Sequence, residues 1–278
     1  MFLSTTSNLH TLFKILTVAL LSSLPSLLSA GRNRLLDDPS QSEQQRRQHS
    51  LSLNGEHAFI TPGLGDVRSP CPALNTLANH GYINRSGKGI SASSLISALT
   101  SVYHLSSPFA ATLVAGGVLC CGNIAKGISL DTLAQHNKIE HDASLVHDNA
   151  LPGAKFAPTQ VNLTLVDELL RTYPGGMGIN ELAQARIQRE MSMFKEKRLN
   201  LNAFHEEIGH GEAALMWLLM KDATNVVNAK TLRQFLGKET FPSTYTIPDE
   251  EISLQKAKEV SAEVGNMMKK VKTSILQN

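Results

Sequence analysis

The sequence has little net charge, few cysteines and no long apolar run, and each shortage excludes a class of protein. Its 26 Lys and Arg residues against 24 Asp and Glu leave a formal net charge of +2. This is too small to indicate nucleic acid or an acidic partner. No apolar stretch approaches the roughly 20 residues that span a bilayer, so we expect no stable membrane anchor.

Three cysteines are too few, and too unevenly placed, for a framework of intramolecular disulfides. Cys120 and Cys121 are adjacent in an apolar segment, and we interpret them as small core residues. The alternative is that one of them bridges a second chain and makes a homodimer. Cys71 stands apart from the pair and is free for chemistry.

The first residues have the pattern of a secretory signal peptide. Lys14 precedes the apolar run 15–21, and small residues follow as far as Ala30. The pattern predicts a signal peptide over residues 1–30 and a secreted, extracellular protein. Residues 31–55 are polar, which predicts a disordered arm or pro-segment. Sequons at Asn84 and Asn162 agree with a secreted glycoprotein.

The remaining sequence predicts an all-α fold. Hydrophobic residues make up 42% of the chain, enough for one sizeable core. Strand signals are few, and the best, 244–247, is short. We expect one domain over 56–242, in which the all-round apolar helix 109–121 is central. A helical extension follows over 243–278, for which interaction tail, packed appendage and frayed helix are all open. The expected helices of the domain cover 72–80, 91–99, 109–121, 130–136, 161–173, 179–197 and 206–221.

Cys71 lies between two prolines at the start of an apolar helix that Gly81 ends. Pro72 suits the first helical position, and glycine suits the position just after a helix. The free N–H groups and the dipole at a helix start favour thiolate over thiol, so we expect a lowered pKa. A thiolate is a nucleophile or a soft metal ligand. The alternative is a buried structural cysteine.

A second cluster joins an acid, an imidazole, an acid and a hydroxyl at Glu140, His141, Asp142 and Ser144. On a helical turn, Glu140 and Ser144 would lie at i, i+4 and share a small hard cation. Asp142 beside His141 suggests an imidazole oriented by a carboxylate. The alternative is a helix N-terminus with capping acids.

Glu212 begins a nearly continuous apolar run. On the apolar side of a helix its pKa would be raised by desolvation unless the carboxylate is paired, which suits a general acid and base. The alternative places it in the first helical turn, half exposed. Upstream, His205 and His210 resemble a zinc motif but lie five residues apart. That spacing turns them roughly 140° away from each other on a helix, so they would not share a metal.

Together these segments resemble the fungal haem-thiolate peroxidases, the chloroperoxidase and unspecific peroxygenase family, and within it the short peroxygenase branch. The resemblance covers roughly residues 65–242 in family order. It implies an all-α haem domain with the haem between a Cys-bearing helix start and a Glu-bearing helix. The motifs that carry it are Pro70-Cys71-Pro72 with Ala73-Leu74-Asn75-Thr76-Leu77-Ala78-Asn79-His80-Gly81-Tyr82, His136-Asn137, Glu140-His141-Asp142-Ala143-Ser144-Leu145, Asn162-Leu163-Thr164-Leu165-Val166-Asp167 and Gly211-Glu212-Ala213-Ala214-Leu215.

The resemblance implies a role for each site residue. Cys71 would be the axial thiolate on the iron of haem b. Glu140, the main-chain oxygen of His141 and the Ser144 hydroxyl would hold Mg²⁺ beside a haem propionate. Glu212 would be the distal acid and base.

His141, oriented by Asp142, would position Glu212, as in the short branch of this family. The long branch places an arginine near its glutamate instead, and no arginine adjoins Glu212 in the sequence. Around the distal pocket we expect three apolar side chains, those of Ile139, Leu215 and Met216.

After the distal helix the family runs through Glu-Arg-Leu-Pro to a Gly-Trp. This chain has Glu239-Thr240-Phe241-Pro242 and no Gly-Trp. The function implied is a secreted peroxygenase that uses H₂O₂ to oxygenate or oxidise small organic substrates. The rivals are a halide-oxidising chloroperoxidase and a secreted interaction protein that retains haem with little catalysis.

Overall fold

The fold is all-α, as the sequence predicts. The structure, a computed structural model, describes residues 51, 53–122, 127–195 and 201–277, which all fall in one unit, 51–278. The predicted signal peptide and residues 31–50 of the predicted arm lie outside the described residues. Where the chain is described, β-pairing is limited to isolated bridges, and no helix is long and apolar enough to cross a membrane.

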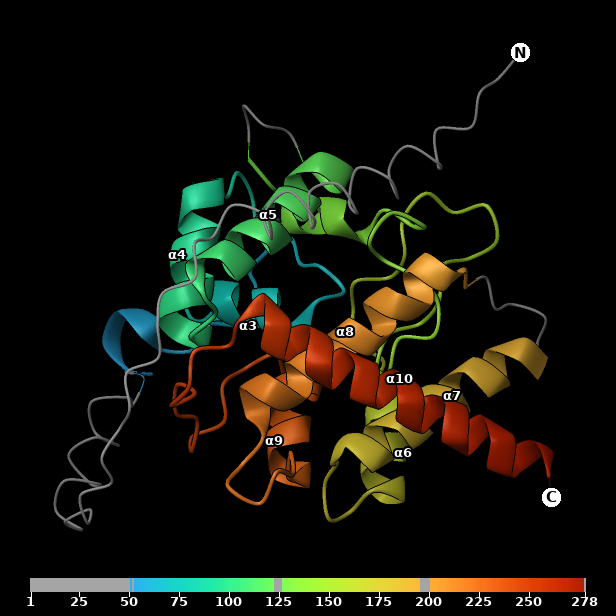
Figure 1. The fold of residues 1–278 in the computed structure, drawn as a ribbon. Helices are drawn as coiled ribbons and strands as arrows, with labels where there is room; N and C mark the ends of the chain where they lie inside the picture. Colours follow the sequence, from blue (N-terminus) through green and yellow to red (C-terminus); the bar gives the residue numbers. More distant parts are fainter. Residues whose placement is uncertain (1–50, 52, 123–126, 196–200, 278) are drawn as a thin grey trace, which may run out of the picture. The chain divides into compact units, whose positions relative to one another are not determined.

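Within the described ranges the helices run in the order of Figure 1. Three short turns of tighter or wider winding accompany them, η1 (Gly55–His57), η2 (Leu130–Ala134) and the π-helical turn η3 (Arg233–Gly237). The α-helices are α3 (Pro72–Asn79), α4 (Ala92–Tyr103), α5 (Ser107–Cys121), α6 (Leu163–Thr172), α7 (Ile179–Lys195), α8 (Ala203–Met220), α9 (Ala229–Leu232) and α10 (Leu254–Leu276).

Short polar side chains start most of these helices. Ser91, the first residue of the expected helix 91–99, caps α4, and its hydroxyl accepts from the N–H of Ser94. Asn162 caps α6 in the same way. Helix α8 begins three residues before the predicted start because Asn202 accepts from the N–H groups of Phe204 and His205. More than two turns of α8 therefore precede Glu212 and the apolar run that follows it, so Glu212 does not lie in the first helical turn.

Helix α5 is less central than its composition predicts. Phe109, Ala110 and Val114 are buried, but 37% of Leu113 and 51% of Leu119 are exposed. The reason for Leu113 is that it borders a cavity rather than packed protein. Of the adjacent cysteines, Cys121 is buried and Cys120 half-buried, and both are free.

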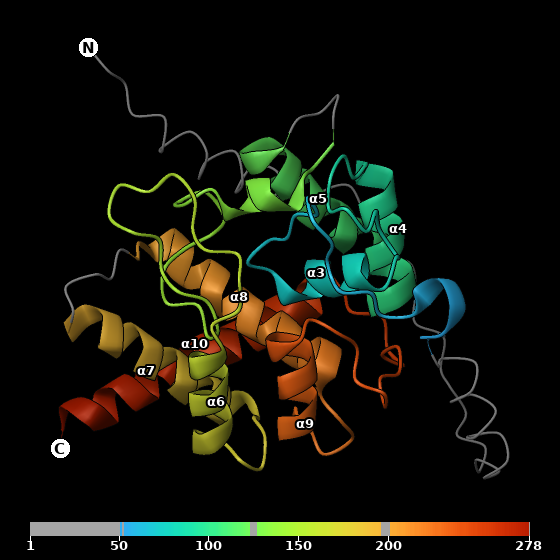
Figure 2. The same cartoon turned by 180° about the vertical axis from the view of Figure 1, so that it is seen from behind.

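The extension after residue 242 contributes a long packed helix. Helix α10 lies across α8 and α7 (Figure 1). Its buried residues recur at helical spacing, and Val264 and Met268 join Ala213 of α8 in a small second core. At Gly265 the helices approach closely, since a Cβ there would lie 3.0 Å from Nδ1 of His210. Helix α10 thus supports α8 on the side that faces away from α3 (Figure 2).

The predicted strand at 244–247 is wrong. Residues 243 and 244 form a turn, and the buried Tyr245 donates from its hydroxyl to the Val102 carbonyl at 2.8 Å. The alternating pattern of residues 244–247 reflects packing of the Tyr245 ring against α4 rather than pairing in a sheet.

Candidate functional site

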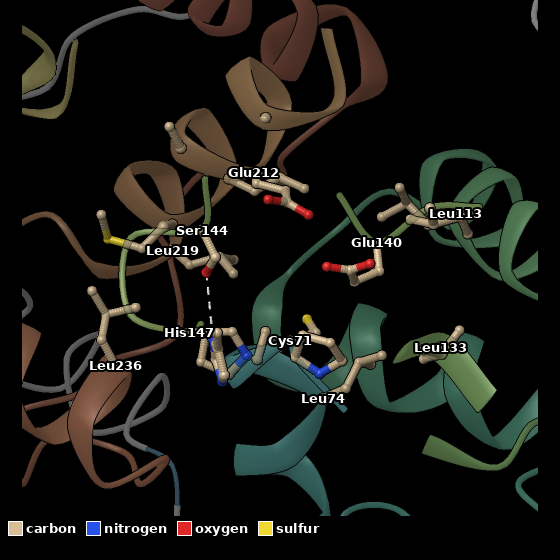
Figure 3. A pocket seen from close by; sticks show the side chains of 18 of the residues that line it. Cys71, Leu74, Leu113, Leu133, Glu140, Ser144, His147, Glu212, Leu219 and Leu236 are labelled. Atoms are coloured by element: carbon tan, nitrogen blue, oxygen red, sulfur yellow. Dashed lines mark hydrogen bonds between the residues drawn. The ribbon is translucent and has the colours of Figure 1, made fainter. Parts of the chain in front are cut away.

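One cavity brings the predicted site residues together. It has a volume of about 320 Å³, and its wall is formed by the start of α3, by α5, by the loop 139–147, and by α7 and α8. Most of the lining is apolar, and Ile139, Leu215 and Met216 belong to it. Figure 3 shows Cys71 pointing into the cavity from one side and Glu212 from another.

Cys71 occupies the position before the first residue of α3. Pro72 is at the first helical position, and Gly81, just past the helix, has φ +72°, so both local predictions are confirmed. The Cys71 carbonyl accepts the first helical hydrogen bond, from the N–H of Asn75 at 3.1 Å.

The predicted lowering of the Cys71 pKa is wrong for the chain without ligand. Burial raises the pKa of the thiol from 9.0 to about 11. The backbone N–H groups of Leu74 and Ala73 lower it, as the helix start predicts, but by less. The negative charge of Glu212 across the cavity adds to the effect of burial. Desolvation therefore outweighs the helix terminus, and the sulfur needs a cation beside it to ionise at neutral pH.

Glu212 and His141 form the polar pair of the cavity. His141 Nε2 lies 3.4 Å from Glu212 Oε2, and only 2% of the imidazole is exposed. The Glu212 side chain is 56% exposed because it faces the cavity. Burial lowers the pKa of His141, but the charge of Glu212 more than reverses this and raises it. The pair therefore favours imidazolium beside carboxylate.

A raised pKa was expected for Glu212 only if its carboxylate were unpaired, and here it is paired with His141. Burial raises the pKa of Glu212, but the positive charges of His141 and Arg186 outweigh burial and lower it. The carboxylate is thereby kept ionised and ready to accept a proton.

The main-chain oxygen of Asp142 orients His141, and the predicted role of the Asp142 carboxylate stays a prediction. His141 Nδ1 donates to the main-chain oxygen of Asp142 at 2.7 Å, which leaves Nε2 facing Glu212. Asp142 itself is buried, and it is not part of the cavity wall. The loop backbone thus fixes the imidazole.

The expected cation cluster takes another form. Glu140 and Ser144 both line the cavity, but residues 140–149 form a loop without a helix, so neither the shared helical turn nor the capping alternative applies. Glu140 Oε2 instead accepts from His136 Nδ1 at 2.8 Å. Within the described part of the chain no group of three or more His, Cys, Asp or Glu side chains is arranged to hold a metal. The Mg²⁺ site stays a prediction.

Two side chains of the cavity wall were missed by the sequence analysis. Arg186, on α7, is 2% exposed and its Nη1 donates to the Ala143 carbonyl at 3.2 Å. It supplies an arginine near Glu212 although none adjoins it in the sequence. The signal was Gly209, a glycine inside α8, where a Cβ would overlap the Arg186 guanidinium.

The second missed residue is His147. It is 2% exposed, its Nδ1 lies 3.4 Å from Ser144 Oγ, and its Nε2 has no hydrogen-bond partner in the protein. Burial lowers the pKa of His147 to about 4. It is therefore a neutral polar group on an otherwise largely apolar wall (Figure 3).

His205 and His210 are kept apart by the fold. The His205 ring is buried and its centroid lies 5.9 Å from that of His141. His210 faces Gly265 of α10. Each imidazole packs against a different element, as their spacing on one helix requires.

Comparison with known proteins points to one family. The sequence profile described as "Peroxidase, family 2" matches residues 57–250. An aromatic peroxidase, fscJ, of Fusarium equiseti is 38% identical over 121 residues, which are 42% of this chain and 26% of that protein.

Two further relatives are a chloroperoxidase and a peroxygenase. The chloroperoxidase of Leptoxyphium fumago is 37% identical over 99 residues, 33% of this chain and 26% of the relative. The aromatic peroxygenase of Coprinellus radians is 29% identical over 151 residues, 48% of this chain and 58% of the relative. The matched parts thus span less than two thirds of the length of these relatives.

Proposed function

The chain belongs to peroxidase family 2, the haem-thiolate peroxidases whose motifs its sequence carries, and on this premise we propose that it is a secreted peroxygenase or peroxidase. It would use H₂O₂ to oxygenate or oxidise small organic substrates. The observation that supports this most is the pairing within one cavity of the Cys71 sulfur with Glu212, which is itself in contact with His141.

The residues of the cavity fit a haem. The wall is mainly apolar, as a porphyrin requires, and Cys71 supplies a thiol that can become an anionic soft ligand on it. Because the Cys71 pKa is about 11, the thiolate would form as it binds iron and releases its proton. The N–H groups of Ala73 and Leu74 would then face a sulfur that carries charge.

Haem b and Mg²⁺ are the cofactors we propose. Glu140, the His141 carbonyl and Ser144 are the oxygen donors available for the cation. Since Glu140 is now held by His136, the cation would have to replace that imidazole as the partner of Glu140.

The bound haem would supply a thiolate-ligated iron, which favours cleavage of the O–O bond. Glu212 Oε2 would take the first proton of H₂O₂ and deliver it to the departing oxygen. His141 Nε2 would hold that carboxylate in place and keep it ionised before the reaction. Arg186 adds a second positive charge that keeps the Glu212 carboxylate ionised. Leu215, Met216 and Ile139 would exclude water around the substrate.

Secretion, glycosylation and dimerisation are part of the proposal and stay predictions. Asn84 is exposed and Asn162 is half-buried at the start of α6, so both sequons lie at or near the surface. Cys120 is the more accessible of the adjacent cysteines and the better candidate for a bridge between chains. Electrophoresis without reductant would detect that bridge.

The test is the ferrous–CO spectrum of the expressed full-length chain together with product analysis. We expect the red-shifted Soret band of a thiolate-ligated haem, lost in Cys71→Ser, and H₂O₂-dependent oxygenation of an aromatic substrate. Glu212→Ala should reduce this oxygenation by about 10²- to 10⁴-fold, the usual contribution of a general acid and base. The exposed Glu206→Ala on the same helix is the control.

Other outcomes identify the rivals. Chlorination of an activated diketone without oxygenation would favour the chloroperoxidase, in agreement with the Leptoxyphium fumago relative. A chain that binds no haem would contradict the enzyme function altogether.

A further inference from the structure

Behind Cys71, the side chain of Asn75 uses its entire hydrogen-bonding capacity on two partners. Its Oδ1 accepts from the N–H and the hydroxyl of Ser69 at 2.9 and 3.0 Å. Its Nδ2 donates to the Ser69 carbonyl and to Glu239 Oε1, both at 2.6 Å. Asn75 and Ser69 are fully buried. The amide thus ties the loop 69–72, here called the Cys71 loop, to Glu239.

The bonds run in one direction, from Cys71 to the carboxylate. An ionised carboxylate only accepts hydrogen bonds, so it turns the NH₂ end of Asn75 toward itself and the oxygen toward Ser69. The Ser69 hydroxyl then donates to Asn75 Oδ1 at 3.0 Å rather than to the Cys71 carbonyl at 3.4 Å. This leaves Ser69 Oγ to accept from the Cys71 N–H at 3.2 Å. Bonds in such a chain strengthen one another.

Glu239 is itself held in a strained position. Its φ of +50° lies in the left-handed region, which residues other than glycine adopt only at a cost in free energy. Asn79 Nδ2 holds the Glu239 carbonyl at 3.0 Å, and Arg68 binds Asn79 Oδ1 through Nε and Nη2. A second asparagine of α3 therefore fixes the backbone of Glu239, while the first takes its carboxylate.

We propose that Glu239 is a positioning residue for Cys71, which holds the Cys71 loop through Asn75 and Ser69 and places a negative charge at the end of a hydrogen-bond chain from the Cys71 N–H. The idea rests on the proposed function, because it assigns the charge an effect on the iron that Cys71 would bind. A partly buried negative charge near the thiolate favours the oxidised, more positive metal. The carboxylate therefore keeps the reduction potential of the iron low. The hydrogen bonds from Glu239 through Asn75 to Ser69, here called the clamp, keep the sulfur in place.

Three variants separate charge from clamp. Glu239→Gln keeps an oxygen for Asn75 but removes the charge, and Glu239→Ala removes both. Glu250→Gln, at an exposed position outside the network, is the control. The measurement is the one-electron reduction potential of the holoenzyme in mildly alkaline buffer, by spectroelectrochemistry. For Glu239→Gln we expect unchanged haem content and a shift of the reduction equilibrium toward ferrous by up to about tenfold, or about 59 mV. A potential equal to that of Glu250→Gln would overturn the effect of the charge.

The clamp has a readout that needs no haem, the hydrogen exchange of the Ser69 and Cys71 amides in the full-length chain. We expect Glu239→Ala to speed this exchange by about tenfold, as loss of a hydrogen bond to a charged group predicts. Glu239→Gln should restore protection. Equal exchange in the wild type and Glu239→Ala would overturn the clamp. If the wild type itself lacks the red-shifted ferrous–CO band, the proposed function and the electronic role fail together, and the exchange rates still decide on the clamp.

Discussion

His141 Nε2 and Glu212 Oε2 lie 3.4 Å apart across the boundary between a loop and helix α8. The orientation of the His141 ring is fixed from its other nitrogen, because Nδ1 donates to the Asp142 carbonyl at 2.7 Å. Each partner shifts the pKa of the other toward its charged form. The carboxylate is therefore prepared to accept a proton, which a desolvated carboxylate without a positive partner would not be.

Replacement of His141 should move the acidic limb of the pH–rate profile. His141→Gln removes the largest of the positive influences that lower the Glu212 pKa. The carboxylate would then become protonated at a higher pH, and kcat/KM at mildly acidic pH should fall on the order of tenfold. The measurement is the pH dependence of H₂O₂-driven oxygenation.

His210→Gln is the matched control for that experiment. His210 is on the same helix as Glu212, but its ring faces Gly265 of α10 rather than the cavity. We expect its acidic limb to coincide with that of the wild type. An acidic limb of His141→Gln that also coincides would show that the contact does not set the ionisation of Glu212.

Arg186 should act on Glu212 by charge and not only by packing. Its guanidinium lowers the pKa of Glu212 and also lies 3.6 Å from Glu190. Arg186→Met should move the acidic limb to higher pH. Glu190→Gln leaves the Arg186 guanidinium in the cavity wall but weakens the ion pairs of residue 190 with Arg186 and Lys272. This variant should therefore lose about 1–3 kcal/mol of stability and keep the acidic limb of the wild type. Equal shifts in the two variants would contradict the assignment to charge.

The sequence predicts the parts of this site that local chemistry determines. The position of Cys71 before α3 follows from Pro72 and Gly81, and the start of α4 follows from Ser91. These signals act within one or two turns of a helix, so neighbouring residues suffice to reveal them.

What the sequence does not predict depends on distant contacts. The helical turn considered for Glu140 and Ser144 does not form, because Ala143 has φ +65° and its carbonyl is held by Arg186 of α7. The direction of the Cys71 pKa was wrong because the helix start is local whereas burial comes from the whole cavity wall. Arg186 itself reaches Glu212 only through the packing of α7 against α8.

Two glycines of α8 should respond oppositely to alanine. A Cβ at Gly209 would overlap the guanidinium of Arg186, whereas a Cβ at Gly211 would meet no atom within 4 Å. Gly211→Ala should therefore stabilise the protein by roughly 0.5–1 kcal/mol through helix propensity. Gly209→Ala should destabilise it by about 1–3 kcal/mol, since the buried arginine has to move. Chemical denaturation measures both, and equal stabilisation would mean that the guanidinium shifts at no cost.

The ionisation of Glu239 should make the stability of the protein depend on pH. Burial raises the pKa of Glu239 from 4.5 to about 7, against the lowering effects of Asn75 and Arg68. Between these values the folded chain binds more protons than the unfolded chain, so this group's contribution is fully present below the lower pKa and is lost as pH rises through the higher one. The loss is on the order of 3 kcal/mol. Glu239→Gln cannot titrate, so its free energy of unfolding should fall less than that of the wild type over the same interval. Glu250→Gln should follow the wild type. If the curves of the wild type and Glu239→Gln remain parallel from acidic to neutral pH, the pKa of Glu239 is not raised by its partly buried position.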